Sequence, residues 1–150
     1  MAEREMNLTF RSDIVWPWGL FFSEIAELMS GELPALKKAT IDLVLGDFLT
    51  PQAVSGKEAD VGFVTPPACV TMAFRGVGPY HHKMENLRAI GVLPHDDRML
   101  LAVPEDFRIH SIKDMKDYSL RLVILNRDFP VCFAVEKILG AYGAPTDEIN

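Results

Sequence analysis

The stretch of sequence that decides the fold is residues 59–67, Ala59-Asp60-Val61-Gly62-Phe63-Val64-Thr65-Pro66-Pro67. Residues 59–64 are mostly apolar, which is typical of a short buried strand. Thr65 and the prolines that follow favour a helix start, because a threonine can cap a helix and proline suits its first position. The stretch therefore predicts a strand, a tight turn and a helix.

The same pattern recurs upstream. Strands are predicted over 6–11 and 39–45, and helices are predicted to begin at Pro17 and at Thr50-Pro51. Glycines end the three predicted helices, at Gly31, Gly56 and Gly76. Strands that alternate with helices in this way indicate an α/β fold with a parallel sheet.

Downstream, residues 76–86 are rich in glycine and proline and predict a surface loop. Strands are expected over 87–93 and 120–125. A capping box is expected at Ser111–Asp114, with Asp in place of the usual Glu, and a last helix over 129–142. The pattern breaks at 94–98, so we expect two Rossmann-like lobes, residues 1–94 and an incomplete lobe at 95–150.

The composition of the chain limits the classes of function that it can have. The chain has 150 residues, a net charge of -6 and scattered Lys and Arg, which argues against nucleic acid as a partner. No apolar run approaches the ~20 residues of a membrane span. Residues 1–5 lack the apolar core of a signal peptide, so we expect a periplasmic protein if a signal was removed and a cytoplasmic one otherwise. Cys69 and Cys132 are predicted to be buried apolar residues.

Ligands of open parallel sheets bind beyond the carboxyl ends of the strands, where helices begin. We therefore expect ligand contacts from the residues at these positions: Ser12, Asp13, Trp16, Asp47, Thr50, Thr65 and Pro66 in the first lobe, and Asn126 and Arg127 in the second. Thr-Pro is also a common capping pair, and Trp16 equally suits a cover for the core. Arg127 suits either a carboxylate ligand or a surface salt bridge.

The usual catalytic motifs are missing from the sequence: there is no nucleophile elbow, phosphate-binding loop, dinucleotide fingerprint or Cys-x-x-Cys. His81 and His82 are adjacent, so their side chains diverge on regular structure. His95 lies in the connector between the two predicted lobes. We therefore expect no metal, no cofactor and no catalytic turnover.

From about residue 7 onward the chain resembles the TAXI family, the solute receptors of TRAP transporters, which are type II periplasmic-binding proteins. The resemblance lies in Ala59-Asp60-Val61-Gly62-Phe63, in Leu87-Arg88-Ala89-Ile90, in a Pro104–Lys116 segment with Ile109, Ser111, Ile112, Asp114 and Met115, and in the ending Gly143-Ala144-Pro145. Nitrate-, sulfonate- and thiamine-precursor-binding relatives, which serve ABC transporters, share much of this pattern.

The resemblance implies a receptor whose two lobes close on a small, anionic organic solute and offer it to a membrane permease. Two loops depart from the family pattern, Trp16-Pro17-Trp18 and residues 126–130, and both bear on ligand identity. Family members also continue beyond the equivalent of residue 150, which implies a homodimer or a missing C-terminal half. A metal-dependent enzyme on the same scaffold and a cytoplasmic effector-sensing domain are the alternatives.

Overall fold

The computed structural model describes residues 6–13, 18–93, 98–118, 121–123 and 129–143. The chain divides into two compact units, Met1–Val92 and Leu93–Asn150. The division falls beside the 94–98 segment at which the sequence pattern breaks, although residues 94–97 lie outside the described residues.

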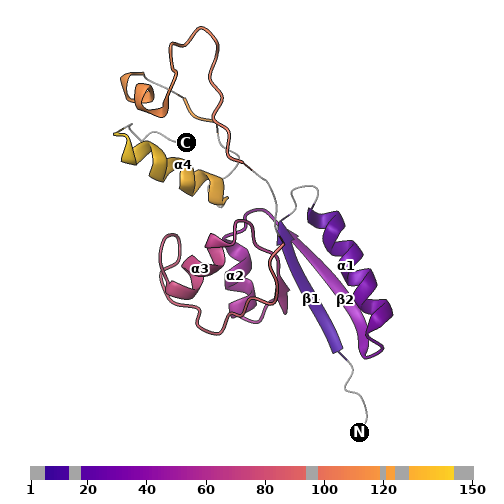
Figure 1. Ribbon diagram of the computed structural model, residues 1–150. Coiled ribbons are helices and arrows are strands. Elements are labelled where there is room, and N and C mark those ends of the chain that lie inside the picture. The colour runs from indigo at the N-terminus through magenta and orange to yellow at the C-terminus, as the bar shows by residue number, and fades with distance from the viewer. Residues whose placement is uncertain (1–5, 14–17, 94–97, 119–120, 124–128, 144–150) are drawn as a thin grey trace. The chain divides into compact units, whose positions relative to one another are not determined.

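The first unit is an α/β structure around a three-stranded sheet in the order β2-β1-β3. Strand β1 (Met6–Asp13) pairs in parallel with β2 (Leu36–Val44) and with β3 (Val61–Gly62). Helix α1 (Trp18–Glu32) covers one face of the sheet, and helices α2 (Leu49–Ser55) and α3 (Ala68–Arg75) lie on the other (Figure 1). The predicted α/β fold with a parallel sheet is confirmed in this unit.

An aromatic core joins α1 to the sheet. Phe10 of β1 and Phe22 of α1 are buried, and the Phe22 ring meets the Phe63 ring edge-on at a centroid separation of 4.8 Å. Full burial of one such side chain contributes about 1.5–3 kcal/mol. Helix α1 continues to Glu32 and does not stop at Gly31, where the sequence predicted its end.

Strand β3 is much shorter than the predicted 59–64, and the Asp60 side chain extends its pairing with β1. The Asp60 backbone N–H donates to the Thr9 carbonyl at 2.9 Å, and the Thr9 N–H donates to Asp60 Oδ2 at 2.7 Å. Beyond the strand, the Phe63 N–H donates to the Arg11 carbonyl at 3.0 Å. The carboxylate thus replaces a carbonyl acceptor at the start of the strand pair.

Two strand predictions are wrong. Residues 87–93 form no strand, and Ile90 and Val92 are 88% and 70% exposed. Residues 121–123, the described core of the predicted strand 120–125, also form none. β-Prone side chains form a strand only beside a partner backbone, and none pairs with these segments within the described residues. The predicted loop 76–86 is confirmed as a mostly exposed loop, but Tyr80 and Met84 within it are buried.

The described part of the second unit contains helices and no strand. Here η1 (Ile112–Asp117) begins at the predicted capping box, where the Ser111 N–H donates to Asp114 Oδ2 at 2.8 Å. Helix α4 (Pro130–Ala141) packs Val135 and Leu139 against Met115 of η1. The predicted box and the predicted last helix are confirmed. No helix among the described residues is long and apolar enough to cross a membrane.

Candidate functional site

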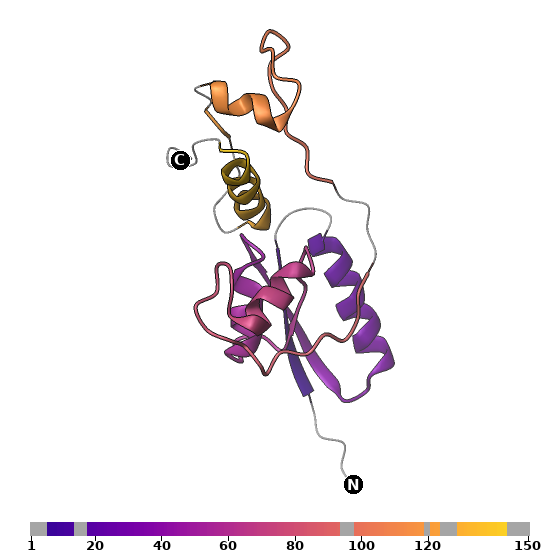
Figure 2. The same ribbon diagram turned by 60° about the vertical axis from the view of Figure 1, so that its left-hand side comes forward.

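The strand order of the first unit places a switch point at the carboxyl ends of β1 and β3. From β1 the chain passes through α1 to β2 on one side, and then through α2 to β3 on the other side of β1. Helices after β1 and β2 therefore cover opposite faces of the sheet (Figure 2). In open parallel sheets, ligands bind beyond the carboxyl ends of the strands at such a switch point.

Five of the predicted ligand residues follow or end these parallel strands. Ser12 lies near the end of β1, Asp47 lies in the turn after β2, and Thr50 lies in the first turn of α2. Thr65 and Pro66 follow β3 and are joined by a cis peptide bond. Because all three strands are parallel, these positions share one end of the sheet.

Accessibility separates these residues into two groups. Ser12, Asp47 and Thr50 are buried, at 0%, 3% and 0% exposure, whereas Thr65 is half-buried and Pro66 is exposed. Asp13 ends β1 in register with Val44, and its side chain is not described. Predicted residues Trp16, Asn126 and Arg127 lie outside the described residues.

Asp47 lies close enough to Cys69 of α3 and to Tyr80 of the following loop to affect their pKa values, and Thr50, whose N–H donates to the Asp47 carbonyl, is also buried. These four residues are called the buried polar cluster. Burial raises the pKa of the Cys69 thiol to about 12, and the nearby Asp47 carboxylate adds to the rise. Burial also raises the pKa of the Tyr80 phenol, with further contributions from Cys69 and Asp47. A neutral thiol of this kind is a poor nucleophile, because the thiolate is the reactive form.

Two hydroxyls in this cluster lack a hydrogen-bond partner, Thr50 Oγ1 and Tyr80 Oη. The Tyr80 ring lies edge-on to the Phe48 ring, with the centroids 6.0 Å apart. The sequence predicted Thr50 as a functional residue but missed Tyr80. The signal for Tyr80 was weak, since a lone tyrosine in a glycine-rich loop is indistinguishable from a surface residue by pattern.

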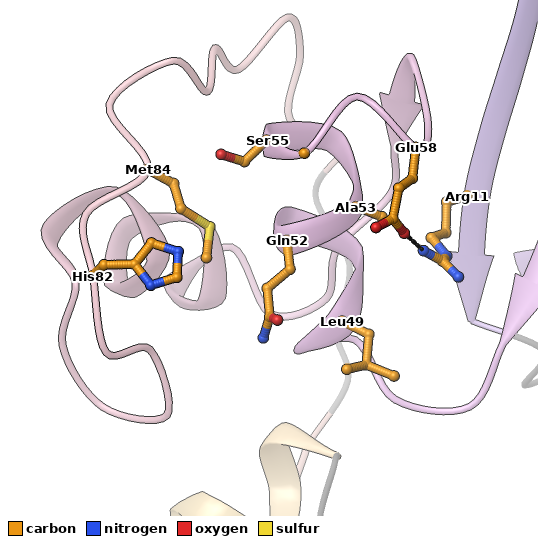
Figure 3. A pocket seen from close by; sticks show the side chains of 9 residues that line it. Arg11, Leu49, Gln52, Ala53, Ser55, Glu58, His82 and Met84 are labelled. Carbon is orange, nitrogen blue, oxygen red and sulfur yellow. Dashed lines mark hydrogen bonds and ion pairs between the residues drawn. The ribbon is translucent and has the colours of Figure 1, made fainter.

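A separate groove of about 450 Å³ runs across the outer side of α2 (Figure 3). Arg11 and Glu58 lie at one end, His82 and Met84 at the other, and Gln52 of α2 between them. Arg11 Nη1 pairs with Glu58 at 3.4 Å, and its Nε lies 3.1 Å from an Asp42 carboxylate oxygen without the alignment of a hydrogen bond. The lining of the groove includes none of the residues predicted from the sequence.

Within the described ranges, no three His, Cys, Asp or Glu side chains gather closely enough to hold a metal ion. His81 and His82 are exposed in the loop after α3, and His95 lies outside the described residues. Asp114 accepts hydrogen bonds from the backbone of His110 and Ser111, which lowers its pKa. That carboxylate therefore has a structural role at the start of η1.

Comparison of the chain with protein-family models finds no match, and neither does comparison with curated proteins or with solved structures.

Proposed function

We propose that the chain binds a small anionic organic solute at the carboxyl ends of β1 and β3, as a receptor of the TAXI type. The observation that carries this proposal is the strand order β2-β1-β3 with every pair parallel, which creates a switch point between β1 and β3. The residues that we assign to the solute are Ser12, Asp13, Asp47, Thr50, Thr65 and Pro66. Trp16, Asn126 and Arg127 are assigned on sequence grounds alone, as are delivery to a permease and a two-lobed receptor architecture.

The chemistry of this sheet end suits recognition without turnover. Its polar side chains are hydroxyls and carboxylates, and the one thiol nearby is kept neutral by burial. Backbone N–H groups at the ends of parallel strands and the starts of helices offer donors to an anion. A catalytic site would require a nucleophile, a base within reach and a group that orients the base. In this proposal the residues at the sheet end bind the solute and take no part in a reaction.

The groove beside α2 is a weaker candidate for an anionic solute. Its single arginine already lies between two carboxylates, Asp42 and Glu58, so its positive charge is largely compensated. A carboxylate solute there would have to compete with Glu58 for the same guanidinium. At the sheet end, Thr65 is half-buried and Pro66 is exposed, so both reach solvent.

Calorimetric titration with a panel of mono- and dicarboxylic acids and of amino acids tests the proposal. We expect at least one member to bind saturably, and the Thr65→Ala variant to weaken that binding at least about tenfold, the loss of roughly 1.4 kcal/mol. Thr71→Ala is the matched control, because Thr71 is an exposed threonine of α3 that follows no strand. Equal loss in both variants, or no saturable binding to any member, contradicts the proposal.

A further inference from the structure

We propose that residues 77–83, here called the cover, form a hinged flap that closes over the buried polar cluster of Asp47, Thr50 and Cys69 and opens without global unfolding. The cover follows α3 and returns beside α2, where Asn86 exchanges two hydrogen bonds with Ser55, at 2.7 and 2.9 Å (Figure 2). Tyr80 points inward and is 3% exposed, whereas His81, His82 and Lys83 face solvent. Tyr80 is therefore the side chain with which the cover closes.

The closed cover leaves two polar atoms unsatisfied. Tyr80 Oη and Thr50 Oγ1 are both inaccessible to solvent and lack a hydrogen-bond partner. A buried hydroxyl without a partner has lost its bonds to water and gained nothing in return. Opening would return both hydroxyls to water, so the closed state is held by apolar packing of Tyr80 on Phe48 against a polar cost.

Local geometry places a hinge at the first end of the cover. Gly76 and Gly78 have positive φ angles, 64° and 69°, in the left-handed region that glycine adopts without strain. The cover also closes directly onto Gly76: a Cβ atom on this residue would lie 2.7 Å from the His82 carbonyl carbon and from the Lys83 nitrogen. The second end is fixed, because the Met84 N–H donates to the Ala73 carbonyl at 3.0 Å and Leu87 is buried.

When the cover opens, solvent and solute reach the side chains of Asp47 and Thr50, which are buried in the closed form. On the proposed function, a solute at the carboxyl end of the sheet would then contact Thr65 directly and these two residues only when the cover lifts. This link to the solute rests on the proposed function. The flap itself does not, and it can be measured with no solute present.

Labelling of Cys69 by a chromogenic aromatic disulfide is the direct test, in a Cys132→Ala background that leaves one thiol. Cys69 is 0% exposed and its thiol is neutral at pH 8, so it reacts only while the cover is open. We expect a labelling rate that hardly changes at low urea concentration, because local opening exposes little surface. A rate that follows the full urea dependence of global unfolding overturns the proposal.

Three variants test whether the labelling rate of Cys69 depends on the cover. Gly76→Ala should speed labelling by about tenfold or more, because its methyl group pushes residues 82 and 83 away. Gly143→Ala is the matched control: Gly143 also follows a helix with positive φ, 75°, but nothing lies within 4 Å of its added Cβ. That variant should leave the rate unchanged.

Tyr80→Phe should slow labelling, because it removes the unsatisfied hydroxyl and keeps the ring. Faster labelling of Tyr80→Phe, or equal acceleration by Gly76→Ala and Gly143→Ala, contradicts a cover of this kind.

Discussion

Strand β3 and helix α2 approach closely at Gly62, and replacement of this residue by alanine tests their packing. A Cβ atom at Gly62 would lie 2.5 Å from Thr50 Cγ2 and 2.9 Å from Val54 Cγ2. Carbon atoms pack at about 3.5–4.0 Å, so the Thr50 methyl group would have to retreat by roughly 1 Å. Thr50 is completely buried and β-branched, which leaves little room for that movement.

Overpacking of this size costs about 1–3 kcal/mol. We expect Gly62→Ala to lower the free energy of unfolding by that amount, measured by urea denaturation and followed by circular dichroism. For a unit of this size the corresponding fall in Tm is about 4–8 °C per kcal/mol.

Gly31→Ala is the matched control. Gly31 lies in α1, and nothing lies within 4 Å of its added Cβ. The same substitution there should stabilise the protein by about 0.5–1 kcal/mol, since alanine favours the helix.

A second change identifies the contact that is responsible. Thr50→Ser removes Cγ2 and keeps the hydroxyl, so Gly62→Ala should cost less in the Thr50→Ser background than in the parent chain. An unchanged or increased stability of Gly62→Ala in the parent chain would refute the reasoning. Equal cost in both backgrounds would show that Thr50 is not the neighbour that resists.

Three further predictions follow from the structure. The raised pKa of Cys69 favours the folded state; this contribution is complete below the ordinary thiol pKa of 9.0 and is lost as the pH rises toward about 12. The free energy of unfolding of the parent chain should therefore be about 1.4 kcal/mol lower at pH 10 than at pH 8, and the difference should be smaller in Cys69→Ala. Urea denaturation at both pH values measures this difference. Asp60→Ala should destabilise the first unit by about 1 kcal/mol through loss of the bond from Thr9, and Asp60→Asn by less because the amide oxygen still accepts, as measured by thermal unfolding. The exposed apolar segment around Ile90 and Val92 should promote association of the 150-residue chain, so sedimentation should show species larger than a monomer, whereas a stable monomer at micromolar concentration would contradict this prediction.

Local sequence patterns predicted the helices and the long strands of the first unit well. Pairing between segments that are distant in the chain could not be predicted from those patterns. Gly56 and Gly76 end α2 and α3 as predicted, because glycine acts through its own backbone. The predicted threonine caps are wrong, since α2 begins at Leu49 after Phe48 and α3 begins at Ala68 after Pro67, and neither helix has a side-chain cap. The segments 87–93 and 121–123 are mostly apolar, as a buried strand would be. Whether such a segment pairs depends on a partner backbone elsewhere in space, which its own sequence does not encode.

The candidate site was likewise predicted in its placement but not in its burial. Parallel strands and their order locate Ser12, Asp47 and Thr65 at one end of the sheet, and the alternation of strands and helices predicted that arrangement. Burial was not predicted, because Tyr80, which lies close to Asp47, comes from the loop after α3. Tyr80 lies 30 residues beyond Thr50 in the chain, and no periodicity joins the two positions.

The central claim, that a small anionic solute binds at the carboxyl ends of β1 and β3, is tested most directly by an NMR titration. The ¹⁵N-labelled chain is titrated with the tightest-binding acid of the calorimetric panel, and the backbone amide shifts are followed. The account predicts saturable shifts at Ser12, Asp13 and Thr65, with smaller ones in the cover. Saturable shifts confined to Gln52, Ser55 and His82, which line the groove beside α2, would contradict it.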